Sequence, residues 1–256
     1  MSLGIRDSIA ALPASKIREV AELGMGREDV IPLWFGESDE PTPDFIKSAA
    51  KAAIDRDQTS YAPNSGLPVL RNAIARYCSG LYGTDITPAQ VTVTASGMQG
   101  IMLTMQALVE PGDNVVAVGP CWPNILGTVA VMGGEPREVA LTESGGRWSL
   151  EVERLFAACD DRTRAVFLNA PGNPTGWMIS RDQQQAILDF CRPRGIWIIC
   201  DDVYARMVYT GHHAPGFLEI TGPEDRIISI NSFSKAWQMT GWRLGWIVAP
   251  ESLLAS

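Results

Sequence analysis

The sequence predicts an α/β protein built on a seven-stranded, mostly parallel sheet with helices on both faces and an antiparallel last strand. Two observations lead to this prediction. From about residue 90 onward, short apolar runs of strand length alternate with longer segments whose apolar residues recur at helical spacing. The connections between most of these runs are long enough to hold a helix, which parallel neighbours require.

The predicted strands are short and rich in Val, Ile and Leu. They lie at 91–94, 115–118, 138–141, 165–169, 196–200, 227–230 and 244–248. The predicted helices between them span 97–109, 123–132, 149–159 and 180–192. The last connection, residues 231–243, is too short for a full crossover, so the strand at 244–248 is predicted to be antiparallel.

The first 60 residues have a different pattern, with one predicted helix. Thr42 supplies a hydroxyl for an N-cap and Pro43 occupies the first position of a helix that continues to residue 55. A second helix is expected over residues 67–81. The polar loop between these helices holds one aromatic residue, Tyr61.

Composition excludes several classes of protein. The 256 residues are 46% hydrophobic and carry a net charge of −8, which fits a folded globular protein and argues against binding to nucleic acid. No apolar run predicts a membrane span. The five cysteines contain no C-x-x-C pair and the only histidines are His212 and His213, so we expect reduced thiols in a cytoplasmic protein, no metal site and no catalytic histidine triad.

The first informative loop follows the strand at 91–94. Ser96, Gly97 and Met98 open a helix there, and small residues let an anion approach the backbone amides at the helix N-terminus. The loop matches neither the dinucleotide fingerprint nor the P-loop pattern. Taken alone, it is equally typical of a plain strand-to-helix turn.

Three further loops follow later strands. Asn173 lies in a rigid loop with two prolines and two glycines, which can fix a side-chain amide in place. Asp201, with Tyr204 three residues later, ends a very apolar strand, where a carboxylate needs a cation to offset its desolvation. Asp202 is better explained as a cap of the next turn.

The last of these loops places a lysine among small hydroxyl residues after the strand at 227–230. Ser232 and Lys235 are followed by Arg243, eight residues beyond the lysine. Partial desolvation lowers the pKa of such a lysine and frees its amine as a nucleophile. A single lysine or arginine would ordinarily be a solvated surface charge.

Carboxyl ends of parallel strands meet at one edge of a sheet, so these groups are expected to lie together. Pyridoxal phosphate (PLP) is the cofactor that needs this set of groups. Lys235 would form a Schiff base with its aldehyde, and Asp201 would keep the pyridine nitrogen protonated. Asn173 and Tyr204 would hydrogen-bond the phenolic oxygen of the cofactor. The phosphate would be held by Ser96, Gly97, Met98, Ser232 and Arg243.

The motifs S-G-M-Q, N-P-T-G, D-D-V-Y, S-F-S-K and G-W-R-L-G, in this order, closely resemble the class I/II aminotransferases of the aspartate aminotransferase fold type, over about residues 31–250. The resemblance implies the large domain of PLP-dependent transferase fold type I. It further implies that Trp122 stacks on the cofactor ring and that Tyr61 reaches the phosphate of the neighbouring subunit in a homodimer. It also implies that Gly36 lines the substrate pocket together with Asn173.

The resemblance implies a division of the chain as well. Residues 1–60 would form the N-terminal arm and the start of a small domain, residues 61–250 the PLP-binding domain, and residues 251–256 the start of the interdomain connection. Family members continue into a small C-terminal domain that carries the arginine for the substrate's α-carboxylate. This sequence stops at Ser256.

The leading hypothesis is an aminotransferase that moves an amino group from an L-amino acid to a 2-oxo acid. Lys235 would anchor the cofactor and, once displaced, act as general base. A β-lyase or decarboxylase on the same scaffold, and a catalytically silent PLP-binding homologue, are the alternatives. The identities of the amino acid and the 2-oxo acid stay open.

Overall fold

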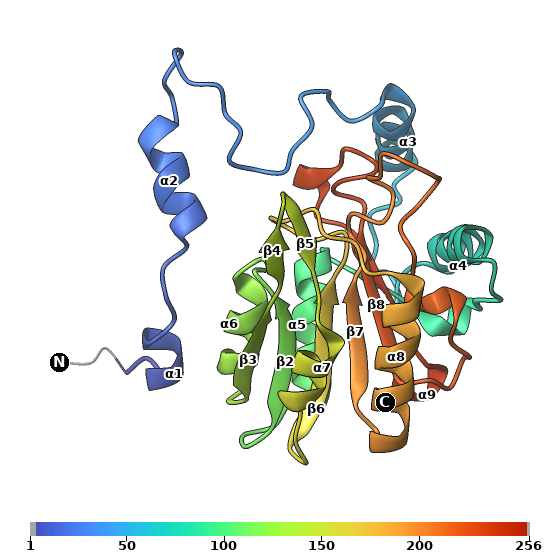
Figure 1. Ribbon diagram of the computed structural model, residues 1–256. Helices are drawn as coiled ribbons and strands as arrows, with labels where there is room; N and C mark the ends of the chain where they lie inside the picture. The colour runs from blue at the N-terminus through green and yellow to red at the C-terminus, as the bar shows by residue number, and fades with distance from the viewer. Residues whose placement is uncertain (1–3, 255–256) are drawn as a thin grey trace.

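The computed structural model describes residues 4–254 and has an α/β core organised around one large sheet (Figure 1). The sheet has seven strands in the order β1-β9-β8-β7-β6-β2-β3. Its strands are β1 (Val91–Thr94), β2 (Asn114–Gly119), β3 (Glu135–Ala140), β6 (Thr163–Asn169), β7 (Trp197–Asp201), β8 (Ile227–Ser232) and β9 (Gly245–Val248).

The strand directions confirm the predicted sheet. Strands β3, β2, β6, β7 and β8 pair in parallel, whereas β9 is antiparallel to both of its neighbours, β8 and β1. Since β9 is antiparallel to both β8 and β1, β1 runs parallel to β8. The carboxyl ends of β1, β6, β7 and β8 therefore lie at one edge of the sheet.

Alternate residues of the strands face two different apolar layers. Val115 and Ala117 of β2 pack with the helices α5 (Gly97–Leu108) and α6 (Asn124–Val131). Val116 and Val118 pack with α7 (Val152–Ala157) and α8 (Arg181–Cys191) on the other face. Helix α4 (Pro68–Tyr82) covers β1 and β9 through Val91, Trp246 and Val248. This alternation is the physical basis of a sheet buried on both faces.

One predicted helix begins later than expected. The sequence predicts a helix over residues 149–159, but α7 starts only at Val152, and Ser149 belongs to a small hairpin of β4 (Thr142–Ser144) and β5 (Arg147–Ser149). Gly145 and Gly146, both with positive φ, form its turn. Two glycines between short polar strands are typical of a hairpin, so the sequence contained this signal.

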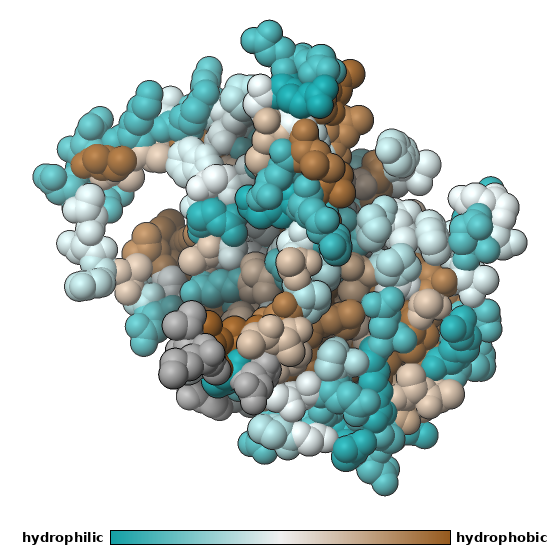
Figure 2. All heavy atoms as spheres, turned by 90° about the vertical axis from the view of Figure 1, so that its left-hand side faces the viewer, coloured by the Kyte–Doolittle hydropathy of each residue, from teal (hydrophilic) through white to brown (hydrophobic). Residues whose placement is uncertain are grey.

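The N-terminal residues form an arm that stands apart from the sheet (Figure 1). The arm carries α1 (Asp7–Ala10) and α2 (Lys16–Gly24) and leads to α3 (Asp44–Asp55). Exposed apolar side chains follow one another along it, namely Val20, Leu23, Ile31 and Leu33. Figure 2 shows this side of the molecule, where hydrophobic residues are exposed in separate clusters among hydrophilic ones.

The predicted N-cap of the helix at residue 43 is wrong. Pro43 occupies the cap position of α3, without a side-chain hydrogen bond. The hydroxyl of Thr42 donates instead to the carbonyl oxygen of Gln238, at 2.5 Å. Thr42 thus ties the start of α3 to the loop that follows β8. This long-range contact outweighs the local capping preference.

Candidate active site

Most of the residues predicted to carry chemistry lie at or shortly after the ends of β1, β6, β7 and β8. Asn169 and Asp201 are paired in the sheet, and Asp201 is paired with Ile230 of β8. The side chains after these positions therefore come from three neighbouring strands at one edge. No helix in residues 4–254 is long and apolar enough to cross a membrane, and no cluster of metal-binding side chains is found in that range.

Lys235 lies in the loop after β8 and reaches across to the N-terminal arm. Its Nζ donates a hydrogen bond to the carbonyl oxygen of Gly36, and it lies 5.8 Å from the centre of the Tyr204 ring. Burial lowers the pKa of the Lys235 amine, and Arg243 lowers it further, while Glu37 and Asp201 act against this shift. A partly desolvated amine of this kind is a better nucleophile than a surface lysine.

Position 36 leaves little room for a side chain, because Tyr204 and Lys235 lie close to it. A Cβ atom at this position would lie 3.1 Å from Tyr204 Oη and 3.2 Å from Lys235 Nζ. The structure therefore brings the predicted substrate-pocket residue directly against the predicted catalytic lysine. They are 199 residues apart in the sequence.

Asp201 is the buried carboxyl group at the end of β7, with 7% of its surface exposed. Burial raises the pKa of Asp201 to about 7. Two interactions lower this pKa in part: the backbone N–H of Val203, which donates to Oδ1 at 3.2 Å, and the charge of Lys235. Such a carboxylate is stabilised by a cation brought to it. A protonated pyridine nitrogen is a cation of this kind, so the site fits the predicted cofactor.

Asn173 and Tyr204 interact electrostatically. Burial raises the pKa of the Tyr204 hydroxyl, and the Asn173 side chain lowers it. Asn169 organises the surrounding loops, because its Oδ1 accepts from the N–H of Asn173 at 2.8 Å and its Nδ2 donates to the carbonyl oxygen of Asp201 at 3.2 Å. The sequence patterns did not predict this role for Asn169. A buried amide at a strand end was its only signal.

Ser96, Gly97 and Met98, which are predicted to bind a phosphate, lie at the N-terminus of α5. Ser96 caps the helix, its Oγ accepting from the N–H of Gln99 at 3.0 Å. A Cβ atom on Gly97 would lie 3.4 Å from Ser232 Cβ, which joins this helix end to β8. The first amides of a helix have no intrahelical acceptor, so those of Gly97 and Met98 are suited to bind an anion.

Gly245 lets β9 lie close to the N-terminus of α5, although it was not among the predicted site residues. A Cβ atom at Gly245 would lie 2.7 Å from both Gly97 N and Asn231 O. Any side chain would push β9 away from α5. The second glycine of the G-W-R-L-G motif was the signal that could have identified it.

Arg243, Trp122 and Tyr61 are placed less directly at the site. Arg243 adopts φ +55°, a left-handed conformation that costs a non-glycine residue roughly 1 kcal/mol. Its Nη1 donates to the carbonyl oxygen of Thr240 at 2.7 Å. Trp122 is half-buried and packs beside α5 and α6. Tyr61 is fully exposed, and no described hydrogen bond or ring contact joins it to the other predicted residues.

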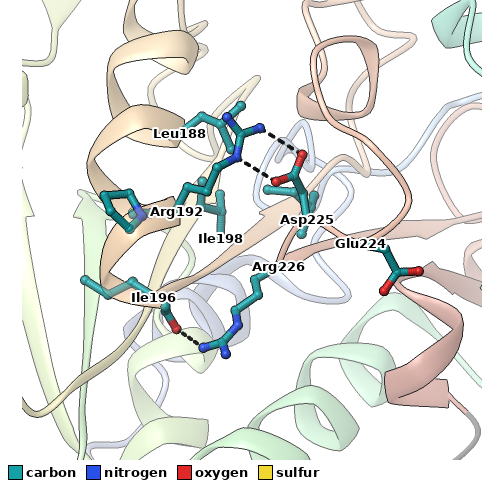
Figure 3. A pocket seen from close by; sticks show the side chains of 11 residues that line it. Leu188, Arg192, Ile196, Ile198, Glu224, Asp225 and Arg226 are labelled. Atoms are coloured by element: carbon teal, nitrogen blue, oxygen red, sulfur yellow. Dashed lines mark hydrogen bonds and ion pairs between the residues drawn. The ribbon is translucent and has the colours of Figure 1, made fainter.

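Two hollows lie at opposite edges of the sheet. One, of about 420 Å³, adjoins Lys235 and is lined in part by Ser38, Tyr77, Arg206 and Trp237. The other, of about 350 Å³, lies where β7 and β8 begin and contains none of the predicted site residues. Figure 3 shows the second hollow, where the carboxylate of Asp225 accepts two hydrogen bonds from Arg192.

This fold and site define a class of protein: the chain belongs to the family described as Aminotransferase class I and II, which matches residues 28–256. Among relatives, it is 36% identical to an aspartate aminotransferase of Pyrococcus horikoshii, covering 98% of this chain and 63% of the relative. It is 34% identical to aromatic-amino-acid aminotransferase 2 of Thermococcus litoralis, covering 97% of this chain and 64% of the relative.

Solved structures agree with this assignment. An aspartate aminotransferase from Thermus thermophilus, in a single-mutant form, superimposes with a TM-score of 0.90 at 30% identity, over 98% of this chain and 66% of that chain. The likeness confirms the predicted fold type. The chain spans less than two thirds of the length of these relatives.

Proposed function

We propose that this chain is the catalytic, cofactor-binding part of a PLP-dependent aminotransferase that moves an amino group from an L-amino acid to a 2-oxo acid. One observation carries the proposal: a partly desolvated lysine amine, Lys235, lies beside Gly36 and Tyr204, and a buried carboxyl group, Asp201, stands on the neighbouring strand. When bound, the cofactor withdraws electrons from the substrate's Cα. The family and the named relatives support the same reaction class.

The chain's own residues have separable tasks in this proposal. Lys235 holds the cofactor covalently through its amine and, after displacement by the substrate, moves the proton at Cα. Asp201 keeps the pyridine nitrogen protonated, and Asn173 and Tyr204 orient the phenolic oxygen. Trp122 covers the ring, and Gly36 and Asn173 line the substrate pocket. The phosphate is bound by Ser96, Gly97, Met98, Ser232 and Arg243.

The test is covalent attachment of PLP. Adding PLP to the protein should produce an absorption band near the visible edge that borohydride fixes as a stable lysine adduct. Lys235→Ala should remove the adduct, whereas Lys51→Ala, at an exposed lysine of α3, should retain it. A reducible adduct that persists in Lys235→Ala would refute the assignment. A β-lyase or decarboxylase would instead release ammonia or CO₂ from the amino acid, and a silent homologue would bind PLP without turnover.

A homodimer with shared sites is part of the proposal. Tyr61 is fully exposed, and the family resemblance assigns it to the phosphate of a neighbouring subunit. Lys235→Ala and Tyr61→Phe subunits, each inactive alone, should regain activity when mixed, because one site of the hybrid carries neither defect. Exchanged subunits without recovered activity would count against sharing.

The proposed division of the chain places residues 1–60 with a small domain and residues 61–250 with the cofactor. Residues 251–256 would begin the interdomain connection. Helix α9 (Glu251–Leu254) lies in that segment, and residues 255–256 lie outside the described part of the chain. The five unpaired cysteines are consistent with a cytoplasmic location.

A further inference from the structure

Two consecutive carboxyl groups are buried at the end of β7, on opposite faces of the sheet. Asp201 and Asp202 are 7% and 6% exposed. Successive side chains of a strand point in opposite directions, so Asp201 faces the cofactor site while Asp202 faces the layer of α4. The proposed aminotransferase function uses only Asp201, and any role of Asp202 at the cofactor site rests on that proposed function.

Asp202 is anchored by three hydrogen bonds that join β7, β8 and the turn carrying Tyr204. The hydroxyl of Ser229 donates to its Oδ2. Its backbone N–H donates to Ile230 O at 2.8 Å, and its carbonyl oxygen accepts from Ala205 N at 2.9 Å. The position of Asp202 is therefore fixed relative to Asp201 and to the cofactor site.

The surroundings of Asp202 offer it no cation. Among residues 4–254, no ion pair to a basic side chain is found for Asp202, and the nearby anionic Glu219 is already paired with Arg181 at 2.5 Å. The Tyr82 hydroxyl, also in this layer, is buried and has no hydrogen-bond partner in the described part of the chain. The titratable groups around Asp202 come from four elements. They are Cys78 and Tyr82 on α4, Cys200 and Asp201 on β7, Glu219 on the 3₁₀ turn at 217–219, and His213, which lies 3.9 Å from Glu219 and faces the Tyr82 ring.

The two carboxyl groups are electrostatically coupled. Burial raises the pKa of Asp202 to about 6, against the lowering effect of the Ser229 hydrogen bond. Burial also raises the pKa of Asp201 to about 7, and the charge of Asp202 raises it further. Two adjacent buried carboxylates repel strongly at low dielectric, so the pair favours one negative charge over two. The other titratable groups around Asp201 are Cys121, Cys200, Tyr204 and Lys235.

We propose that Asp202 is a positioning residue for the cofactor: its buried carboxyl group competes with Asp201 for negative charge and thereby sets the pH below which Asp201 cannot hold a protonated pyridine nitrogen. When a pyridinium approaches, the negative charge settles on Asp201 and the proton is carried by Asp202. The pair then keeps a single negative charge throughout, which avoids burying a second one.

The experiment measures the affinity for PLP as a function of pH between about 5 and about 8.5. In Asp202→Asn the competing charge is gone, so the fall in affinity on the acid side should move to lower pH by about half a unit. This corresponds to roughly threefold tighter binding than in the wild type at about pH 6.5, where the wild-type Asp202 is ionised. Asp225→Asn is the matched control. It removes the same charge at the opposite end of the sheet and should leave the acid limb in place.

A purely structural role predicts a different result. If Asp202→Asn weakens PLP binding by the same factor at every pH, or if Asp225→Asn moves the acid limb equally, the proposal is overturned. Ser229→Ala provides a second route should Asp202→Asn fail to fold. It removes the hydrogen bond that favours the ionised Asp202, so the limb should move in the same direction by a smaller amount, and an unmoved limb would again overturn the proposal.

The same measurement separates the role of Asp202 from the proposed function. If the wild-type chain does not bind PLP through Lys235, the proposed function fails and the role of Asp202 fails with it. If the wild type binds PLP normally and the acid limb stays fixed in Asp202→Asn and Ser229→Ala, only the role of Asp202 fails.

Discussion

The two edges of the sheet use similar chemical groups in opposite ways. At the amino edge, the carboxylate of Asp225 is matched by the guanidinium of Arg192 in a two-pronged ion pair, and Arg226 donates to the carbonyl oxygen of Gly195 (Figure 3). At the carboxyl edge, the Asp201 carboxyl group is buried and no ion pair to it is found among residues 4–254, and the amine of Lys235 contacts a carbonyl oxygen.

The pKa values record this difference. The Arg192 guanidinium holds the pKa of Asp225 below its usual range, whereas burial raises the pKa of Asp201. Two side-chain charges that form an ion pair stabilise the fold modestly, and neither of them is then available to bind a ligand. Charges that folding keeps apart remain available to bind a cofactor, at some cost in stability.

The largest expected effect tests whether the unpaired carboxyl group works in catalysis. If the proposed aminotransferase function holds, Asp201→Asn should raise the activation free energy of transamination by about 4 kcal/mol, roughly a thousandfold in rate. The reason is that the proposed cofactor would lose its protonated pyridine nitrogen with little change in shape. Steady-state kinetics would measure this, with Asp225→Asn as the control from the other edge. Equal rates in Asp201→Asn and wild type, with an inactive Asp202→Asn, would transfer the role to Asp202.

The second prediction concerns stability and pH in the protein without cofactor. The pKa of Asp201 is raised by folding to about 7, so the native state binds the proton more tightly than the unfolded chain. The free energy of unfolding should therefore fall as pH rises from about 4 to about 7. Asp201→Asn should remove the part of this loss that Asp201 causes. Its stability relative to wild type should therefore rise by on the order of 2–3 kcal/mol as pH increases from about 4.5 to about 8, measured by urea unfolding.

The other edge should respond with the opposite sign. The pKa of Asp225 is lowered by folding, so its contribution is present at neutral pH and lost as pH falls through that lowered pKa. Asp225→Asn should thus lose stability relative to wild type at about pH 8 and lose progressively less below about pH 4. The same sign of pH dependence at both edges would contradict the comparison.

The third prediction addresses the close approach of the arm to Lys235. In Gly36→Ala the new methyl group would lie 3.1 Å from Tyr204 Oη and 3.2 Å from Lys235 Nζ. Displacing these groups by a few tenths of an ångström should lower kcat/KM roughly tenfold, with the unfolding free energy unchanged. Gly80→Ala is the control, since a Cβ atom there meets open space in helix α4 and should stabilise the protein by about 0.5–1 kcal/mol.

The smallest effect is expected for the ion pair at the amino edge. Arg192→Ala should cost about 0.5–1 kcal/mol of unfolding free energy, because half of the Arg192 side chain is exposed and solvent screens the pair. The expected change in the transamination rate is less than about twofold. A large loss of activity would show that the two edges are coupled through β7 and β8.

Much of this architecture follows from local sequence patterns. Apolar runs at 91–94 and 227–230, and the short segment at 231–243, were enough to predict the strands and the antiparallel β9. The residues at strand ends, Asp201 and Lys235 among them, could be placed at one edge because parallel strands end together. The N-cap at Thr42 and the helix start at 149 were mispredicted, since a contact with Gln238 and a two-glycine hairpin replace the local preference.

The sequence by itself therefore determined the strands, their shared carboxyl edge and the residue types that end there. Only the tertiary structure decided how those residues meet. It brings Gly36 of the arm close to Lys235 and Gly245 close to the backbone amide of Gly97. It also buries Asp201 and Asp202 on opposite faces of the sheet, with no cation paired to Asp202 in the described part of the chain. The physical reason is that close approach and desolvation depend on atoms far away in the sequence, which no local pattern of residues contains.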